Sequence, residues 1–217
     1  MESGPLPAVD LAQNSLGSIK PLCNVVAVDL ETTGLHSAEE CVIGIGVCFG
    51  DTRMDQHRYV RPTAAIAEAV RLGERRGFAK EIHGIDIQSS EFLDSAVAWD
   101  EAKALIPPEH VLVCHNLRHE ERYVETPHGG YCTMEMAQHL GFGVLVLSEL
   151  HEQLGMGPVA GAHNALVDAQ ATFRVFSRLS AMMSAEDLGL MQREKSTSVL
   201  SNLPKQGSGR RRAIWTK

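Results

Sequence analysis

Two carboxylates stand one residue apart at the end of an apolar stretch, in the run VVAVDLETTGL at 25–35. The apolar part is expected to form a buried strand, and side chains two residues apart on a strand point to the same side. Asp29 and Glu31 would therefore share one face and repel each other unless a cation neutralises them. Carboxylate oxygens are preferred ligands of Mg²⁺ and Mn²⁺. The pair predicts a divalent-cation site, and the alternative is a solvated strand end with two exposed acids before a turn.

A histidine and an aspartate stand at the start of the last strong helical stretch, in the run GAHNALVDAQATF. His163 comes first, and Asp168 follows it inside the expected helix. A histidine beside a helix start is more often a cap or a surface residue than a catalyst. A third polar cluster, CHNLRHEERYV at 114–124, follows a short apolar strand directly. Each of these two clusters is weak evidence by itself, but their joint occurrence with the carboxylate pair is much less easily explained by such local roles.

The elements that must position these clusters can be read from apolar periodicity and from breaks at proline and glycine. Strands are expected at 24–30, 40–49, 56–60 and 110–114, the first three as an antiparallel meander. Helices are expected at 64–74, 90–106, 133–140, 147–154 and 163–182, with a helix start within 116–124. Strands followed by strand–helix alternation predict an α/β fold with a mixed β-sheet flanked by helices.

Taken in order, the three clusters resemble the three sequence motifs of the DEDDh (DnaQ-like) 3′–5′ exonucleases. VVAVDLETTGL fits the first motif, an apolar strand ending in D-x-E-T-T-G. His163 and Asp168 keep the H-x-x-x-x-D step of the third motif at the opening of a helix. The resemblance covers about 25–179 and implies an RNase H-like fold.

The second motif of this family resembles H-N-A-x-F-D, followed by two residues and an apolar pair. The run HNLRHEERYV matches it at His115, Asn116 and 123–124. It departs from the motif at His119, where an aromatic residue is usual, and at Glu120, where the family has aspartate.

The resemblance implies a metal-dependent 3′–5′ exonuclease that hydrolyses phosphodiester bonds with two Mg²⁺ or Mn²⁺ ions about 4 Å apart. The family pattern makes four carboxylates the metal ligands, and these are Asp29, Glu31, Glu120 and Asp168. It also makes His163 the general base that takes the proton from the attacking water.

The partner that the resemblance implies is a nucleic acid with a free 3′ end, expected to be single-stranded. The family pattern assigns contacts with the terminal nucleotide to the backbone at Thr32 and Thr33, to the side chain of Leu35 and to Asn116. DNA and RNA both stay open as substrates, and so does a homodimer.

Glutamate at position 120 is longer than aspartate by about 1.5 Å, and Mg²⁺ demands near-ideal octahedral geometry. Three alternatives stay open. Glu120 substitutes with modest loss, Glu121 or a rearranged helix start supplies the oxygen, or the protein is a weakened or inactive nuclease-fold module. Such a module would bind nucleic acid or a protein partner without cutting.

Composition limits the remaining function classes. The chain has 217 residues, of which 44% are hydrophobic and 22% charged, as expected for one globular domain with tails. No apolar run approaches the roughly 20 residues of a membrane helix, and the first residues lack a secretory or transit pattern. Five widely spaced cysteines are expected to be reduced thiols of a cytoplasmic protein.

The predicted organisation is a flexible leader at 1–22, an exonuclease domain at 23–183 and a polar, basic, disordered tail at 184–217. The net charge is −7, yet the last stretch, 193–217, holds seven basic residues and one acid. That tail leaves a nuclear location open and could also hold nucleic acid electrostatically.

Overall fold

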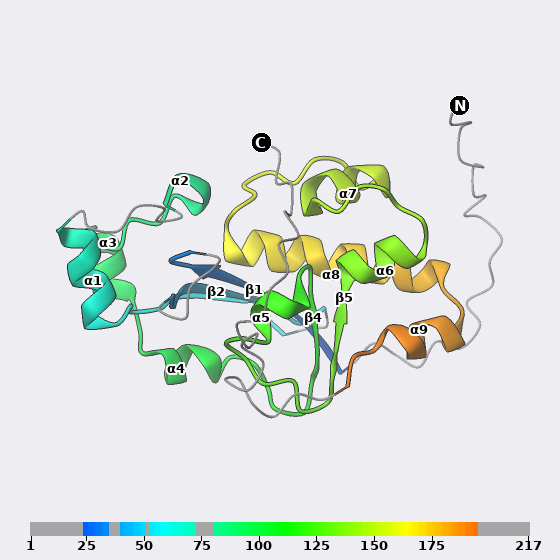
Figure 1. Cartoon of the computed structure of the whole chain (residues 1–217), viewed down its shortest axis with the longest axis horizontal. Coiled ribbons are helices and arrows are strands. Elements are labelled where there is room, and N and C mark those ends of the chain that lie inside the picture. The colour runs from blue at the N-terminus through cyan, green and yellow to red at the C-terminus, as the bar shows by residue number, and fades with distance from the viewer. Residues whose placement is uncertain (1–23, 35–39, 51–52, 73–79, 195–217) are drawn as a thin grey trace, which may run out of the picture.

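A β-sheet forms the centre of the molecule (Figure 1). It has five strands in the order β3-β2-β1-β4-β5. The computed structural model describes residues 24–34, 40–50, 53–72 and 80–194. The strands are β1 (Val25–Thr32), β2 (Val42–Cys48), β3 (Gln56–Tyr59), β4 (Val111–Cys114) and β5 (Gly130–Cys132). The first three are antiparallel, whereas β4 and β5 run parallel to β1. The predicted meander and mixed sheet are confirmed.

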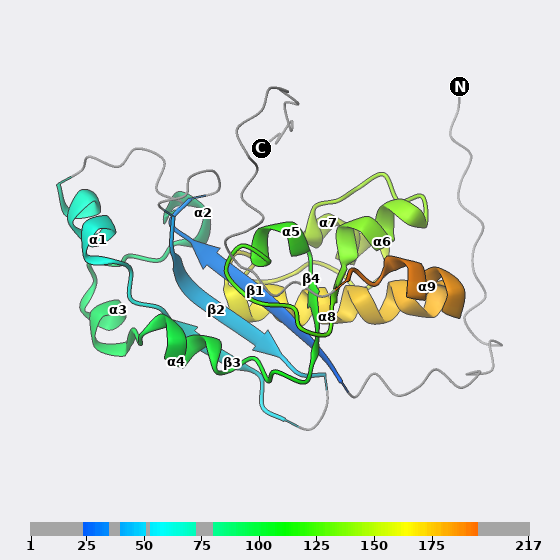
Figure 2. The same ribbon diagram turned by 60° about the horizontal axis from the view of Figure 1, so that its bottom comes forward.

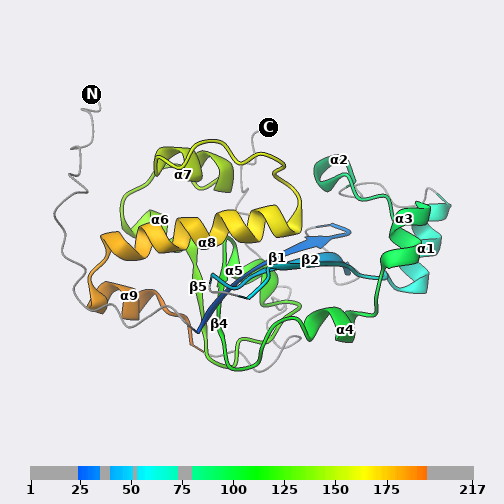
Figure 3. The same ribbon diagram turned by 180° about the vertical axis from the view of Figure 1, so that it is seen from behind.

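Helices cover both faces of this sheet. They are α1 (Ala64–Arg71), α2 (Lys80–His83), α3 (Ser90–Ser95), α4 (Trp99–Lys103), α5 (Leu117–Glu120), α6 (Thr133–His139), α7 (Leu147–Gln153), α8 (Ala165–Met182) and α9 (Ala185–Met191). The long helix α8 lies across one face with α6 and α7 beside it, and α4 and α5 lie on the opposite side (Figure 3). Among these described helices, none is both long and apolar enough to span a membrane.

Alternation along β1 sends its side chains into two different cores. Val26 and Val28 pack on the side of α4 and α5, whereas Val25 and Ala27 pack against α6, α7 and α8. A strand has a side-chain period of two, so the next odd-numbered positions, Asp29 and Glu31, continue the face covered by α8.

Two glycines of β2 lie opposite the two acids of β1. Asp29 pairs with Gly46 and Glu31 pairs with Gly44 in the antiparallel register. A Cβ atom added to Gly46 would lie 2.0 Å from the carbonyl oxygen of Ala165, the first residue of α8. The absence of a side chain at Gly46 therefore lets the start of α8 approach the sheet beside Asp29 (Figure 2).

The prediction of one helix over 90–106 is wrong, because the chain is extended between α3 and α4. The backbone N–H of Val97 donates to the carbonyl of Tyr59 at 3.0 Å, and the Val97 carbonyl accepts from the N–H of Arg61 at 2.8 Å. These bonds beside β3 replace the helical bonds that the apolar spacing favours. The short elements α2, β5 and α9 are not predicted at all.

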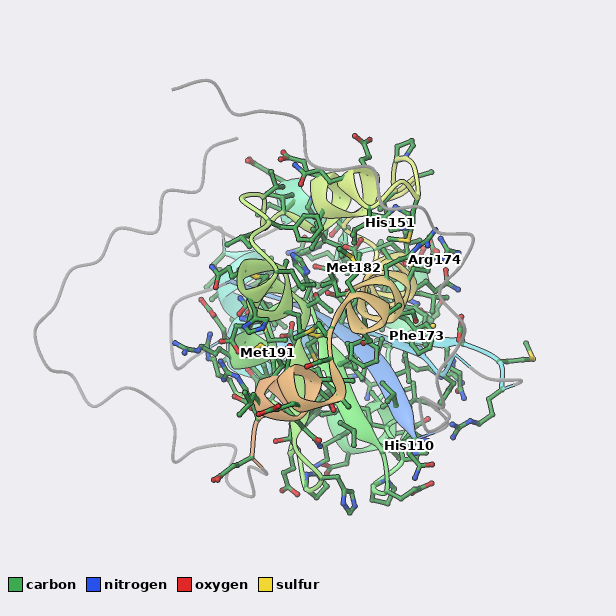
Figure 4. The ribbon with its side chains drawn as sticks, turned by 90° about the vertical axis from the view of Figure 1, so that its right-hand side faces the viewer. His110, His151, Phe173, Arg174, Met182 and Met191 are labelled. Carbon is green, nitrogen blue, oxygen red and sulfur yellow. The ribbon has the colours of Figure 1, made fainter. Side chains whose placement is uncertain are left out.

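The described fold continues past residue 183, the predicted end of the domain. Leu188 and Met191 of α9 pack against the core that also holds Phe176 and Leu179 of α8, and Figure 4 shows α9 below α8 at this end of the molecule. The predicted leader and most of the predicted tail lie outside the described residues, as does Leu35. Their assignment stays a prediction.

Replacing Gly46 with alanine tests the close approach of α8 to the sheet. The added methyl group would push against backbone, so we expect a loss of about 1–3 kcal/mol in the free energy of unfolding, measured by urea titration. Gly189→Ala on α9 is the matched control, because a Cβ atom there meets no atom within 4 Å. Equal stability of Gly46→Ala and the unchanged protein would contradict this packing.

Candidate active site

Three acidic side chains meet where β1 passes the start of α8. Asp29, Glu31 and Asp168 each offer one carboxylate oxygen, and these oxygens all lie within 4.8 Å of one another. Two come from adjacent positions on one face of β1, and the third comes from the first turns of α8. The structure thus brings together three of the four carboxylates expected as metal ligands.

The turn before α8 fixes the third carboxylate. The Asn164 side chain caps the helix, since its Oδ1 accepts from the N–H groups of Leu166 and Val167 at 3.1 and 3.4 Å. His163 adopts a left-handed conformation with φ of 66°, and its backbone N–H donates to Asp168 Oδ2 at 2.8 Å. The backbone of the expected general base is therefore bonded to an expected metal ligand.

Burial and mutual repulsion raise the pKa values of these acids. Burial contributes most to raising the pKa of Asp29 well above its ordinary value, followed by the charges of Glu31, Glu120 and Asp168. The pKa of Glu31 rises to about 8 through burial and the nearby Asp168 charge. Burial also raises the pKa of Asp168, although the backbone N–H and the charge of His163 oppose this rise.

Glu120 lies beside this group and outside it. Its side chain on α5 is buried, and burial is the first cause that raises its pKa to about 8, with the charges of Glu121 and Glu31 adding to it. Its Oε2 atom is buried with no hydrogen-bond partner among the described residues. It is close enough for its charge to raise the pKa of Asp29, but it does not join the three oxygens that lie within 4.8 Å.

The residue set fits a divalent cation. All four groups are carboxylates, the hard oxygen ligands that suit Mg²⁺ and Mn²⁺. One of their oxygens, Glu120 Oε2, is buried and has no hydrogen bond within the described part of the chain. A cation among Asp29, Glu31 and Asp168 would remove the repulsion that raises the pKa of Asp29.

Thr32 and Thr33 use their hydroxyl groups to fix the turn after β1. The Thr32 hydroxyl donates to the Gly34 carbonyl at 2.7 Å, and the Thr33 hydroxyl accepts from the N–H of Cys41 at 3.1 Å. Both threonines are buried. Their side chains thus hold the backbone that is expected to face the substrate.

The two residues that open the second motif differ in their surroundings. The His115 ring bonds to the Thr133 hydroxyl at 2.8 Å and to the Leu145 carbonyl at 2.6 Å, and burial lowers its pKa to about 4. His115 therefore ties β4 to α6 and the following loop as a neutral ring. Asn116 precedes α5 and makes no side-chain capping bond to it.

His119 stands where the family pattern has an aromatic residue. Its ring centroid lies 5.5 Å from that of Tyr123, at an interplanar angle of 60°. The guanidinium of Arg122 lies 5.3 Å from the same tyrosine ring. The imidazole thus packs against an aromatic ring in place of the usual side chain.

One pocket beside the acids is lined by His163 and by other residues to which the sequence motifs assign no role. Its volume is about 120 Å³, and its lining includes His57, Tyr59, His83 and His163. Burial lowers the pKa values of His57 and His83. Part of this arrangement can be read from the sequence, since His57 and Tyr59 are two residues apart on one strand and point to the same side.

The strand order β3-β2-β1-β4-β5 and the helices on both faces of the sheet are those of an RNase H-like fold. No family model matches the chain, and no curated protein matches its sequence. The fold is similar to that of exonuclease X in complex with 5′-overhanging duplex DNA, at 20% identity and a TM-score of 0.56. That match covers 77% of this chain and 98% of the other.

Two further structures share this fold. E. coli exonuclease I in complex with a dT13 oligonucleotide matches at 16% identity and a TM-score of 0.55, over 76% of this chain and 42% of that chain. S. pombe Pop2p in its Mg²⁺- and Mn²⁺-bound form matches at 13% identity and a TM-score of 0.50, over 76% and 84%. The chain thus spans less than half of exonuclease I, and the likeness establishes the RNase H-like fold.

The raised pKa values predict how stability depends on pH without metal. A carboxyl group that titrates at about 8 in the folded protein and near 4.5 when unfolded stabilises the fold below pH 4.5. That stability is lost as the pH rises through about 8. The pKa of Asp29 is raised in the same direction by burial and by the charges of its three acidic neighbours. We therefore expect Asp29→Asn to raise the melting temperature in EDTA by about 3 °C or more at pH 8, with a smaller gain at pH 5.

The measurement is thermal unfolding followed by circular dichroism. Asp94→Asn on the exposed side of α3 is the control and should leave the melting temperature unchanged. A lower melting temperature of Asp29→Asn at pH 8 would show that Asp29 is held by favourable contacts instead of being repelled.

Proposed function

We propose that this protein is a metal-dependent exonuclease that hydrolyses phosphodiester bonds from the 3′ end of a single-stranded nucleic acid. The observation that carries the proposal is the group of three carboxylate oxygens within 4.8 Å, contributed by Asp29, Glu31 and Asp168. The group lies in a fold that exonuclease X, exonuclease I and Pop2p share. The fold alone would not indicate an activity.

Asp29, Glu31 and Asp168, together with Glu120, would hold two Mg²⁺ or Mn²⁺ ions. When bound, such ions supply an activated water and stabilise the charge that develops on the leaving oxygen. The partly buried position of these acids supports the proposal, because water screens their charges less than charges on an exposed surface.

His163 would act as the general base. An imidazole can accept and release a proton near neutral pH. The side chain is exposed at the mouth of the site, while the backbone of the same residue is bonded to Asp168. The helix cap at Asn164 and the bond to Asp168 would keep His163 in place during proton transfer.

The 3′-terminal nucleotide would lie against the turn after β1. The backbone at Thr32 and Thr33 would face it, with Leu35 against its base and Asn116 on the side of α5. The complexes of E. coli exonuclease I with dT13 and dA16 oligonucleotides support a single-stranded partner.

Incubation with a 5′-labelled single strand and Mg²⁺ or Mn²⁺ tests the activity. The label should remain on a ladder of fragments that shorten one nucleotide at a time, and Asp29→Asn should slow this roughly 100-fold or more, as expected for loss of transition-state charge stabilisation. His163→Ala should lower kcat roughly 100-fold or more with little change in KM. Asp94→Asn is the control for unchanged activity.

Blocking the 3′ end with a phosphate should stop the shortening. Absence of shortening with either metal, or shortening that persists in Asp29→Asn, would remove the basis of the proposal.

A second candidate function is a module that binds nucleic acid or a protein partner without cutting. The observation that favours it is the place of Glu120, which lies outside the group of three oxygens. Metal binding separates the two candidates, because a module that only binds has no need of a complete metal site.

Titration of the protein with Mn²⁺ by calorimetry makes this test. If Glu120 is a ligand, Glu120→Gln should weaken Mn²⁺ binding by roughly 10-fold or more, since even loss of a group that only supports a ligand costs about that much. Glu120→Asp should keep most of the affinity, and Glu125→Gln on the exposed surface should keep all of it. Unchanged binding by Glu120→Gln would favour the module without nuclease activity.

A further inference from the structure

The chain after α9 returns to the edge of β5. The N–H of Arg193 donates to the Gly130 carbonyl at 2.8 Å, and the N–H of Gly130 donates back to the Arg193 carbonyl at 3.3 Å. The Gln192 side-chain amide donates to the His128 carbonyl at 3.0 Å. A Cβ atom on Gly129 would lie 2.1 Å from the Arg193 carbonyl oxygen. This segment is therefore fixed closely against β5, although it lies beyond 25–179, the part of the sequence that resembles the exonuclease family.

The side chain of Arg193 joins α6 to the end of α5. Its Nε donates to Glu135 Oε2 at 3.0 Å, and its Nη2 donates to Glu135 Oε1, so the pair is bidentate. Its Nη1 donates to Glu121 Oε2 at 3.4 Å. The exposed fractions of the Arg193 and Glu121 side chains are only 23% and 14%. Solvent therefore screens this contact less than an exposed ion pair.

Glu120 is the last residue of the short helix α5, and Glu121 follows it directly. The helix α5 has four residues, Leu117–Glu120, and a helix of that length is not stable without tertiary contacts. Its first residue, Leu117, is fully buried in the core. The other end carries two adjacent carboxylates, and the charge of Glu121 already raises the pKa of Glu120. Without Arg193, Glu121 would lose its ion pair at 3.4 Å and keep only the charge of the more exposed Arg118 nearby.

We propose that Arg193 is a positioning residue of the metal site, which binds Glu121 so that Glu120 faces Asp29. This inference rests on the proposed function, since it assigns a role toward the same carboxylates. The segment after α9 then contributes to the geometry of the metal site, although it supplies no metal ligand. It also excludes Glu121 as the ligand that replaces the aspartate of the family pattern.

Four variants test this role: Arg193→Gln, Glu121→Gln, the double variant and Arg193→Lys. Mn²⁺ affinity by calorimetry and kcat and KM on a 5′-labelled single strand are measured for each full-length protein, with melting temperature as the check on folding. Arg118→Gln is the matched control, because Arg118 also lies near Glu135, at 3.7 Å, but has a side chain that is 77% exposed.

Arg193→Gln should weaken Mn²⁺ binding about 10-fold or more and lower kcat with little change in KM. The double variant should recover most of the Mn²⁺ affinity, because it removes the carboxylate that competes with Glu120. Arg193→Lys should be intermediate, since lysine cannot make the bidentate pair. Arg118→Gln should match the unchanged protein.

Normal Mn²⁺ affinity and kcat in Arg193→Gln, with the unchanged protein active, would overturn the role of Arg193 alone. So would a loss of affinity in Arg193→Gln that the double variant does not recover, or a lower melting temperature with normal affinity in the folded protein. Absence of Mn²⁺ binding and of activity in the unchanged protein would instead overturn the proposed function, and the role of Arg193 with it.

Discussion

Mutual repulsion among partly buried carboxylates is the constraint on which the rest of this structure depends. Asp29, Glu31 and Asp168 are held with their oxygens within 4.8 Å, and the charge of Glu120 reaches Asp29 from the side. Such an arrangement lowers the stability of the metal-free protein at neutral pH, so the surrounding packing must offset it. Sites of this kind are expected where function, and not stability, determines which residues are present.

The acids are held together by a close backbone contact at a glycine and by hydrogen bonds that cap a helix. Gly46 lets the backbone at Ala165 approach the sheet, and the cap at Asn164 sets the direction of α8. On the other side of β1, α5 carries Glu120 and is held by the buried Leu117 at its start and by Arg193 beyond its end. The two arms of the site are thus positioned by different parts of the chain, and each depends on a residue outside the three sequence motifs, Gly46 for α8 and Arg193 for α5.

The features that could be predicted from the sequence are those set by local periodicity. Strand alternation places Asp29 and Glu31 on one face, and helical spacing identifies the buried side of α8. Neither pattern shows which other element packs against that face. Non-local bonds account for what could not be predicted. Val97 leaves a helical pattern to pair beside β3, and His115 of the second motif is used to join β4 to α6. The contact of Arg193 with α5 joins positions 72 residues apart, for which a single sequence contains no periodic signal.

Anomalous diffraction from crystals of the protein grown with Mn²⁺ is the most direct measurement of the central claim, because it locates the ions and their ligands together. We expect two Mn²⁺ peaks between β1, α5 and α8, with carboxylate oxygens of Asp29, Glu31 and Asp168 as ligands and Glu120 directed toward the same site. Absence of any peak there, or a peak bound by Glu121 in place of Glu120, would contradict this claim.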